Sequence, residues 1–129
     1  MNLEIGLKHL VEITVEQKDT AAAFGSGSVT VLATPMMVTL MENAALKAVE
    51  NALPEGHTTV GTHLDVSHKA ATPMGMKAYA EAELIEIKGK KLIFKVTARD
   101  EVEVIGEGTH TRYIVALESF LENTAKKQK

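Results

Sequence analysis

Glu42 is the single charged residue between Thr20 and Leu46, in a stretch that is otherwise apolar or made of small residues. Because an isolated charge is costly to bury, the carboxylate of such a residue either reaches solvent or has a function. Farther along the chain, His68 ends the segment VGTHLDVSH. A carboxylate on a helix and an imidazole on a facing strand can together carry out acid–base or acyl-transfer chemistry. Thr34, which precedes Glu42 by two helical turns, adds a hydroxyl group.

A long helix, predicted over residues 35–53, must position Glu42. Thr34 is expected to be its N-cap, because a threonine oxygen accepts from a free backbone N–H, and Pro35 suits the first helical position. The sequence Pro54-Glu55-Gly56 ends it. Glu42 lies about 95° from the middle of the polar stripe, so it is displaced toward the apolar side. The stripe consists of Thr39, Asn43, Lys47 and Glu50.

The hydroxyl of Thr34 has two interpretations. As a plain N-cap it accepts from a backbone N–H in the first helical turn, and this alone explains its presence. In the functional interpretation, a reacting carbonyl lies at the same helix end, where free N–H groups and the positive end of the dipole stabilise an oxyanion. Since Pro35 has no N–H, the donors would come from Met36, Met37 or another segment. The spacing of the residues by itself favours the interpretation of Thr34 as a plain N-cap.

The strand predicted over residues 58–71 places His68 on its apolar face. Side chains alternate along a strand, so His68 shares a face with Leu64 and Val66, whereas Gly61 and His63 point the other way. Two interpretations stay open: a core histidine with one hydrogen bond, or one half of a pair with Glu42. His63 and His68 face opposite sides and cannot share an ion, so we predict no metal site.

The remaining pattern predicts an α+β fold in a single domain spanning residues 1–129. A half-buried strand alternates over residues 9–16, a loop covers residues 18–28, and a charged tail, expected to be frayed, covers residues 118–129. Further strands are predicted over residues 76–88, 91–104 and 106–117, with a hairpin turn at Gly89-Lys90. One helix packed on an antiparallel sheet is the expected architecture.

Composition narrows the classes of function. The net charge is −3, which argues against nucleic-acid binding, and there is no cysteine, so neither a disulfide nor a thiol nucleophile exists. The absence of cysteine fits a cytoplasmic protein. Residues 20–41 are uncharged, but the GSGS sequence and Pro35 interrupt them, so we predict no membrane-spanning segment.

Four segments in a fixed order resemble the hotdog-fold thioesterases related to fluoroacetyl-CoA thioesterase. They are TPMMVTLMENAA, VGTHLDVSHKAATPMGM, L-x-x-I-K-G-K-K-L-x-F-x-V and IGEGTHTRYIV, and the similarity covers residues 33–120. The resemblance implies a hotdog fold, in which a five- to six-stranded antiparallel sheet wraps one long central helix. It implies that Thr34, Glu42 and His68 are the catalytic residues and that Gly61 and Arg112 line the acyl pocket. It also implies a dimer whose two sheets join edge to edge.

Two further residues, Phe24 and Met36, are assigned to substrate binding. Phe24 is the single aromatic residue between the first strand and the helix, in a stretch of small residues. This leaves no basis for an aromatic lid, so selectivity for fluorinated substrates is not carried over from the resemblance.

The expected function is hydrolysis of a short-chain acyl-CoA thioester at a Thr/Glu/His site. Coenzyme A enters as part of the substrate, and no separate cofactor is expected. The alternatives are a hotdog hydratase or dehydratase, which also uses a carboxylate and an imidazole, and a non-catalytic acyl-CoA-binding module. We expect a homodimer, or a higher assembly of dimers, and neither a nucleic-acid nor a membrane partner.

Overall fold

The computed structural model describes residues 2–128, which form five strands, one long helix and several shorter helices. In chain order the elements are β1 (Lys8–Thr14), η1 (Gln17–Asp19), α1 (Ala21–Phe24), α2 (Thr34–Val49), η2 (Glu50–Ala52), β2 (His57–His68), β3 (Lys77–Lys88), β4 (Lys91–Asp100), β5 (Val104–Ala116) and α3 (Leu117–Ala125). No helix of the described residues is both long and apolar enough to cross a membrane.

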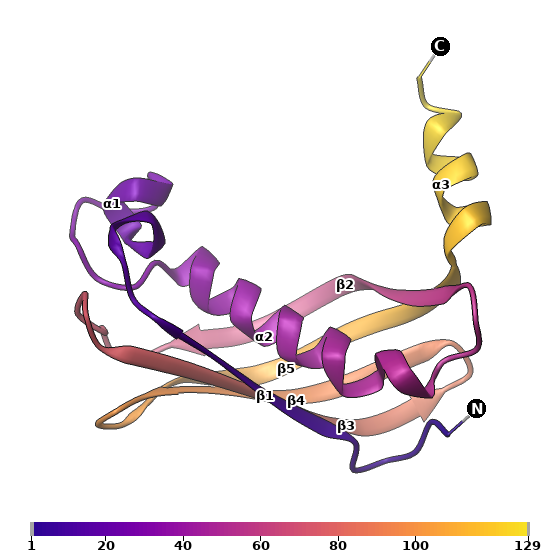
Figure 1. Cartoon of the computed structure of the whole chain (residues 1–129), viewed down its shortest axis with the longest axis horizontal. Coiled ribbons are helices and arrows are strands. Elements are labelled where there is room, and N and C mark those ends of the chain that lie inside the picture. Colours follow the sequence, from indigo (N-terminus) through magenta and orange to yellow (C-terminus); the bar gives the residue numbers. More distant parts are fainter. Residues whose placement is uncertain (1, 129) are drawn as a thin grey trace.

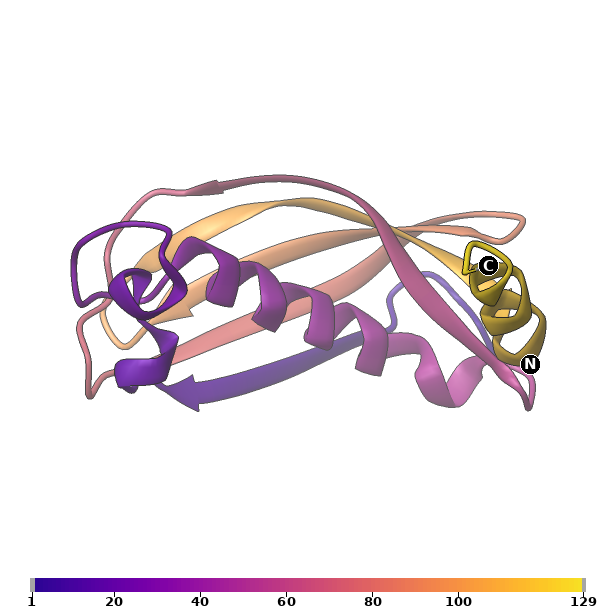
Figure 2. The ribbon, with the colours of Figure 1, turned by 90° about the horizontal axis from the view of Figure 1, so that it is seen from above.

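The strands form one antiparallel sheet in the order β1-β3-β4-β5-β2, and α2 lies along one of its faces (Figure 1). Seen from above, the helix runs along the length of the curved sheet (Figure 2). The predicted α+β architecture is therefore confirmed, with five strands. β2 is an edge strand that pairs with β5 alone, and this strand carries His68.

Small side chains on β3 let α2 pack closely against the sheet. Ala78, Ala80 and Ala82 alternate along β3 and are fully buried. Met37 and Met41 of α2 are fully buried in the same core cluster, and β4 contributes larger side chains to it. Because α2 packs mainly on β3 and β1, it covers the β5–β2 side of the sheet much less.

A β-bulge in β2 changes which side chains face the helix. The register with β5 shifts between Gly61 and His63, so Thr62 is the extra residue. As a result, both Thr59 and Gly61 lie on the helix side before the bulge, and Leu64 and His68 lie on it afterwards. The predicted alternation was therefore wrong for Gly61, because an uninterrupted strand was assumed.

The start of α2 also differs from the prediction. Ala33, with extended backbone angles, is the N-cap residue, and Thr34 is already helical. The Thr34 side chain therefore does not cap the helix, and no side-chain cap is present. The helix ends at Val49 and continues as η2 to Ala52.

Two segments predicted to be irregular are helical instead. The loop before α2 contains η1 and α1, because Thr20 caps α1 through a hydrogen bond from the backbone N–H of Ala23 and Gly25 ends it with φ of 75°. The tail after β5 forms α3, whose apolar residues Leu117, Phe120 and Leu121 follow the i, i+3, i+4 spacing of a helix. Lys129 lies outside the described residues.

Candidate functional site

Thr34 and His68 meet at the end of the sheet where α2 begins. The Oγ1 atom of Thr34 lies 2.7 Å from Nδ1 of His68, a short hydrogen bond between residues far apart in the sequence. Because α2 begins one residue earlier than predicted, the threonine hydroxyl points to the histidine instead of to its own backbone. The hydroxyl is thus part of a hydroxyl–imidazole pair.

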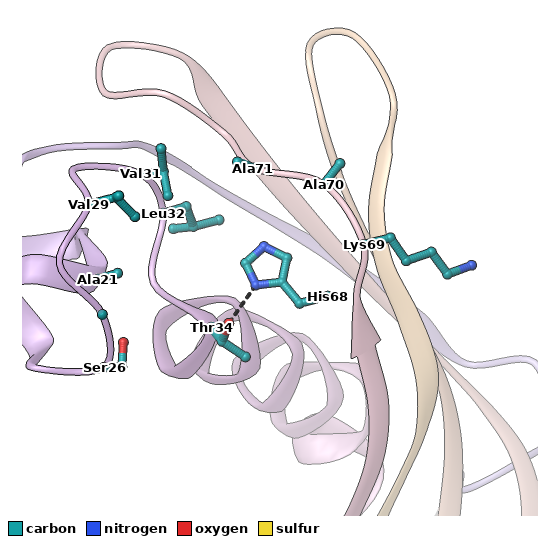
Figure 3. Close-up of a pocket in the computed structure, with 11 residues that line it drawn as sticks. Ala21, Ser26, Val29, Val31, Leu32, Thr34, His68, Lys69, Ala70 and Ala71 are labelled. Atoms are coloured by element: carbon teal, nitrogen blue, oxygen red, sulfur yellow. Dashed lines mark hydrogen bonds between the residues drawn. The ribbon is translucent and has the colours of Figure 1, made fainter.

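A cavity of about 290 Å³ borders this pair. Its wall comes from the loop before α2 and from the residues that follow β2, and Figure 3 shows Thr34 and His68 side by side at its edge. The lining side chains are mostly small or β-branched, and Lys69 points away from the cavity in the same view (Figure 3). The remaining lining residues are Ala21, Ser26, Gly27, Val29, Val31, Leu32, Ala70 and Ala71.

The second ring nitrogen of His68, Nε2, has no hydrogen-bond partner in the part of the chain that the structure describes. The Nε2 atom is also buried. Burial lowers the pKa of His68, and the nearby Ala70 backbone opposes this shift without a well-aligned hydrogen bond. The imidazole is therefore mostly neutral at pH 7. A buried nitrogen with an unused donor or acceptor is suited to a substrate, since an unpaired buried polar atom is otherwise costly.

Glu42 lies apart from Thr34 and His68 within one chain. Eight residues of helix separate Thr34 from Glu42, which corresponds to about 12 Å along the helix axis. The half-buried carboxylate of Glu42 instead lies over Gly61, where an added Cβ atom would lie 3.0 Å from its Oε2 atom. Among the described residues, Glu42 forms no hydrogen bond to Thr34 or His68.

Two buried side chains of β5, His110 and Arg112, face Glu42 across Gly61. A Cβ atom at Gly61 would lie 3.0 Å from His110 Cε1 and 3.4 Å from Arg112 Nη1. Arg112 is 7% exposed and His110 is fully buried. Burial lowers the pKa of Arg112, and the Glu42 charge opposes the shift. The glycine therefore leaves room for three polar groups to converge.

The other two residues assigned to substrate binding lie outside the cavity. Phe24, the last residue of α1, is 45% exposed, and it is not among the residues that line the cavity. Met36 is half-buried and packs against the hydrophobic core. Within residues 2–128, no group of three metal-ligating side chains is close enough to hold an ion.

His110 and Thr59, which both form hydrogen bonds with Arg112, are the polar residues of this region that the sequence analysis missed. The sequence did contain a signal for His110, because His110 and Arg112 are two residues apart and therefore share one face of a strand. Thr59 gave no such signal, because the bulge after Gly61 placed it on an unexpected face.

A helix packed along one face of a curved antiparallel sheet is the arrangement of the hotdog fold. A hotdog-like protein from Thermanaerovibrio acidaminovorans has this fold, with a TM-score of 0.87 at 18% identity over 97% of this chain and 93% of that one. The chain belongs to the family described as fluoroacetyl-CoA-specific thioesterase, whose model matches residues 15–118.

Individual relatives agree with this assignment. The chain is 43% identical over 90 residues to the fluoroacetyl-CoA thioesterase of Streptantibioticus cattleyicolor, which is 70% of this chain and 65% of the relative's length. The structure of the fluoroacetyl-CoA thioesterase FlK matches with a TM-score of 0.91 at 32% identity, covering 98% of both chains. A thioesterase superfamily member from Thermus thermophilus matches with a TM-score of 0.86 at 26% identity, covering 96% of this chain and 94% of that one. The predicted hotdog fold is confirmed.

Proposed function

We propose that this protein hydrolyses short-chain acyl-CoA thioesters. Membership of the thioesterase family supports the reaction type. The relative FlK has been solved as a mutant with acetyl-CoA, and as another mutant with fluoroacetate and CoA, which supports small acyl groups. The observation in this chain that carries the proposal is the Thr34–His68 pair, 2.7 Å apart, with Nε2 of His68 buried and unpaired beside a cavity.

The size and lining of the cavity favour a short acyl group. Its volume of about 290 Å³ is at the lower end of the range for small-molecule sites. Alanine, glycine and valine side chains dominate the wall, and no aromatic residue is among the lining residues. An acetyl-sized or slightly larger group fits such a space without a long channel, and we propose no preference for fluorinated substrates.

In the proposed reaction, the acyl carbon is attacked and the bond to the CoA sulfur breaks. Glu42 acts either as the nucleophile, which gives an anhydride that water then hydrolyses, or as the base that takes a proton from the attacking water. The CoA thiolate leaves and receives a proton. Thr34 donates its hydroxyl proton in a hydrogen bond to Nδ1 of His68 and so fixes the tautomer of the neutral ring, and Nε2–H of His68 donates to the thioester oxygen on which negative charge develops.

We further propose a homodimer in which two chains complete each site. Glu42 is about 12 Å along the helix from Thr34, too far for both to act on one carbonyl within one chain. If two β2 edge strands pair antiparallel near their middle, Gly61 of one copy approaches His68 of the other, and the Glu42 above Gly61 moves with it. The half-buried Leu64 and Val66 on β2, on the side that α2 covers least, support a second copy there.

A thiol-release screen over acyl-CoA chain lengths tests the function. We expect acetyl-, propionyl- and butyryl-CoA to be hydrolysed, with a steep decline for octanoyl-CoA. Binding of acyl-CoA without thiol release would favour the non-catalytic binding module. A change in enoyl absorbance with crotonyl-CoA, without thiol release, would favour the hydratase. We propose a cytoplasmic location for this chain, which has no cysteine. The screen is run without a thiol reductant, because the reductant would itself react with the reagent that detects the released thiol.

A further inference from the structure

A buried polar cluster lies below the middle of α2, away from Thr34 and His68. It consists of Thr59 on β2 and of His110 and Arg112 on β5, which are 4%, 0% and 7% exposed. A buried guanidinium is costly unless its N–H groups are all directed to acceptors, so this cluster requires an explanation.

Three hydrogen bonds hold the Arg112 guanidinium against the sheet. Nε donates to Thr59 Oγ1 at 2.7 Å, and Nη2 donates to the Thr59 carbonyl at 2.9 Å. Nη1 lies 3.1 Å from Nε2 of His110. Since a guanidinium can only donate, Nε2 of His110 must accept this bond.

The hydrogen bond of the other ring nitrogen, Nδ1, fixes the protonation state of the His110 ring. Nδ1 lies 2.9 Å from the backbone carbonyl of His63, which can only accept, so Nδ1 carries the proton. His110 is therefore a neutral imidazole with both nitrogens used. Burial lowers the pKa of His110, as does the charge of Arg112, and together these outweigh the His63 carbonyl and Glu42, which raise it.

Glu42 faces this cluster without bonding to it. Its Oε2 and Nη1 of Arg112 both border the space that a Gly61 side chain would fill, at 3.0 and 3.4 Å from the Cβ position. No ion pair between Arg112 and Glu42 exists among residues 2–128, although each lies near enough to influence the other. The guanidinium of Arg112 is thus held close to the carboxylate of Glu42 without forming an ion pair with it.

We infer that His110 is a positioning residue, whose Nε2 atom holds Arg112 against the sheet and so keeps the Glu42 carboxylate free for the reaction. A guanidinium released from His110 can turn toward Glu42 and form a bidentate ion pair, which is a strong interaction. A carboxylate oxygen engaged in such a pair is a poorer nucleophile and a poorer base. The importance of His110 for turnover rests on the proposed thioesterase function, whereas its hold on Arg112 does not.

Two substitutions test the hydrogen-bond acceptor of His110 and its aromatic ring separately. His110→Phe keeps a ring beside Phe94, whose centroid is 6.4 Å away, and removes the acceptor. His110→Gln gives up the ring and keeps an amide oxygen that can accept from Arg112. We expect His110→Phe to lower kcat about 10- to 100-fold with KM within about 2-fold, and His110→Gln to recover most of kcat. His63→Gln, which changes an exposed side chain and leaves the His63 carbonyl in place, is the matched control.

A double-mutant cycle shows whether His110 acts through Arg112. In an Arg112→Met background, a further His110→Phe substitution should lower kcat less than about 2-fold, because the group it positions is gone. A His110→Phe variant that keeps its kcat, beside a His110→Gln variant that loses it, would mean that the ring is only a packing element and would overturn the inference. Equal losses in the two variants, or full additivity with Arg112→Met, would overturn it as well.

Structural readouts keep the test independent of turnover. In the wild-type protein, ¹⁵N NMR should show the His110 ring as the neutral Nδ1–H form. A crystal structure of His110→Phe should show Arg112 in direct contact with Glu42. If the wild-type protein releases no thiol from any acyl-CoA, the proposed function fails, and these two measurements still decide the role of His110. An Arg112 that stays on Thr59, away from Glu42, in His110→Phe would overturn the inference.

Discussion

The carboxylate of Glu42 lies directly over the bare Cα of Gly61, and a Cβ atom there would approach Oε2 to 3.0 Å. This contact joins the middle of α2 to the bulged part of the edge strand. It explains why a residue without a side chain is required at this point, since His110 Cε1 is equally close to the same position. The position of Glu42 and the identity of residue 61 are therefore linked.

Gly61→Ala should lower turnover more than stability. The added methyl group must displace Glu42 or His110 by a few tenths of an ångström, and a small misplacement of a reacting group can cost about 10²-fold in rate. We expect kcat to fall at least 10-fold while the melting temperature changes by only a few degrees. Thr62→Ala, at the exposed bulge residue, is the control and should retain activity. A fully active Gly61→Ala enzyme would contradict the assignment of Glu42.

Glu42→Gln should retain the fold and lose turnover. The substitution keeps the size of the side chain and removes a half-buried charge whose desolvation is a burden on stability. If Glu42 is the nucleophile or base, we expect kcat to fall about 10²-fold or more. Thiol release and circular dichroism are measured together, with Glu50→Gln, at the exposed C-cap position of α2, as control. Unchanged thiol release from a folded Glu42→Gln protein would refute this role.

Thr34→Ala should affect catalysis and leave stability nearly unchanged. Thr34 is exposed and caps nothing, so its hydroxyl contributes little to the helix, and the free energy of unfolding should change by less than about 0.5 kcal/mol. Loss of the hydrogen bond to His68 should lower kcat about 10-fold, and Thr34→Ser should retain most of it. Urea unfolding and kinetics of both variants are compared. A destabilised Thr34→Ala with normal kcat would instead indicate a purely structural hydroxyl.

Mixing two impaired variants tests whether two chains share a site. In a randomly reassociated equimolar mixture of Thr34→Ala and Glu42→Gln, half of the dimers are mixed, and each mixed dimer has one intact site. Activity should therefore return to roughly a quarter of the wild-type value. Light scattering should give twice the 13.9 kDa mass of one chain. A monomer at micromolar concentration, or no recovery after verified exchange, would disprove the shared site.

Stability should fall as the pH falls below about 6.5. Burial holds the pKa of both His68 and His110 below the ordinary value of 6.5, so the unfolded chain takes up these protons first. The stabilisation is complete above that value and is lost as the pH falls toward the lowered values in the folded protein. Urea midpoints at pH 8 and pH 5 measure the effect. His110→Gln should reduce the difference between them, and a larger difference in that variant would contradict the argument.

Local signals in the sequence were enough to define the main elements and the residue types of the site. Alternation, the proline and glycine that follow the helical segment, and the lone charge at Glu42 are such signals. They correctly predicted one long helix and an antiparallel sheet, although α2 ends at Val49 and a 3-10 turn covers residues 50–52. Thr34 and His68 were also found from the sequence, and their hydrogen bond places them together. Local patterns work here because backbone geometry repeats every 3.6 residues in a helix and every two residues in a strand.

The grouping of those residues depends on the three-dimensional packing of the chain. A one-residue shift at the start of α2 turned the Thr34 hydroxyl from its own backbone to His68, and one extra residue at Thr62 turned Gly61 toward the helix. Glu42 consequently lies with His110 and Arg112, about two helical turns from Thr34. Shifts and bulges of one residue are fixed by packing across the sheet, a sum of long-range contacts that no local pattern contains.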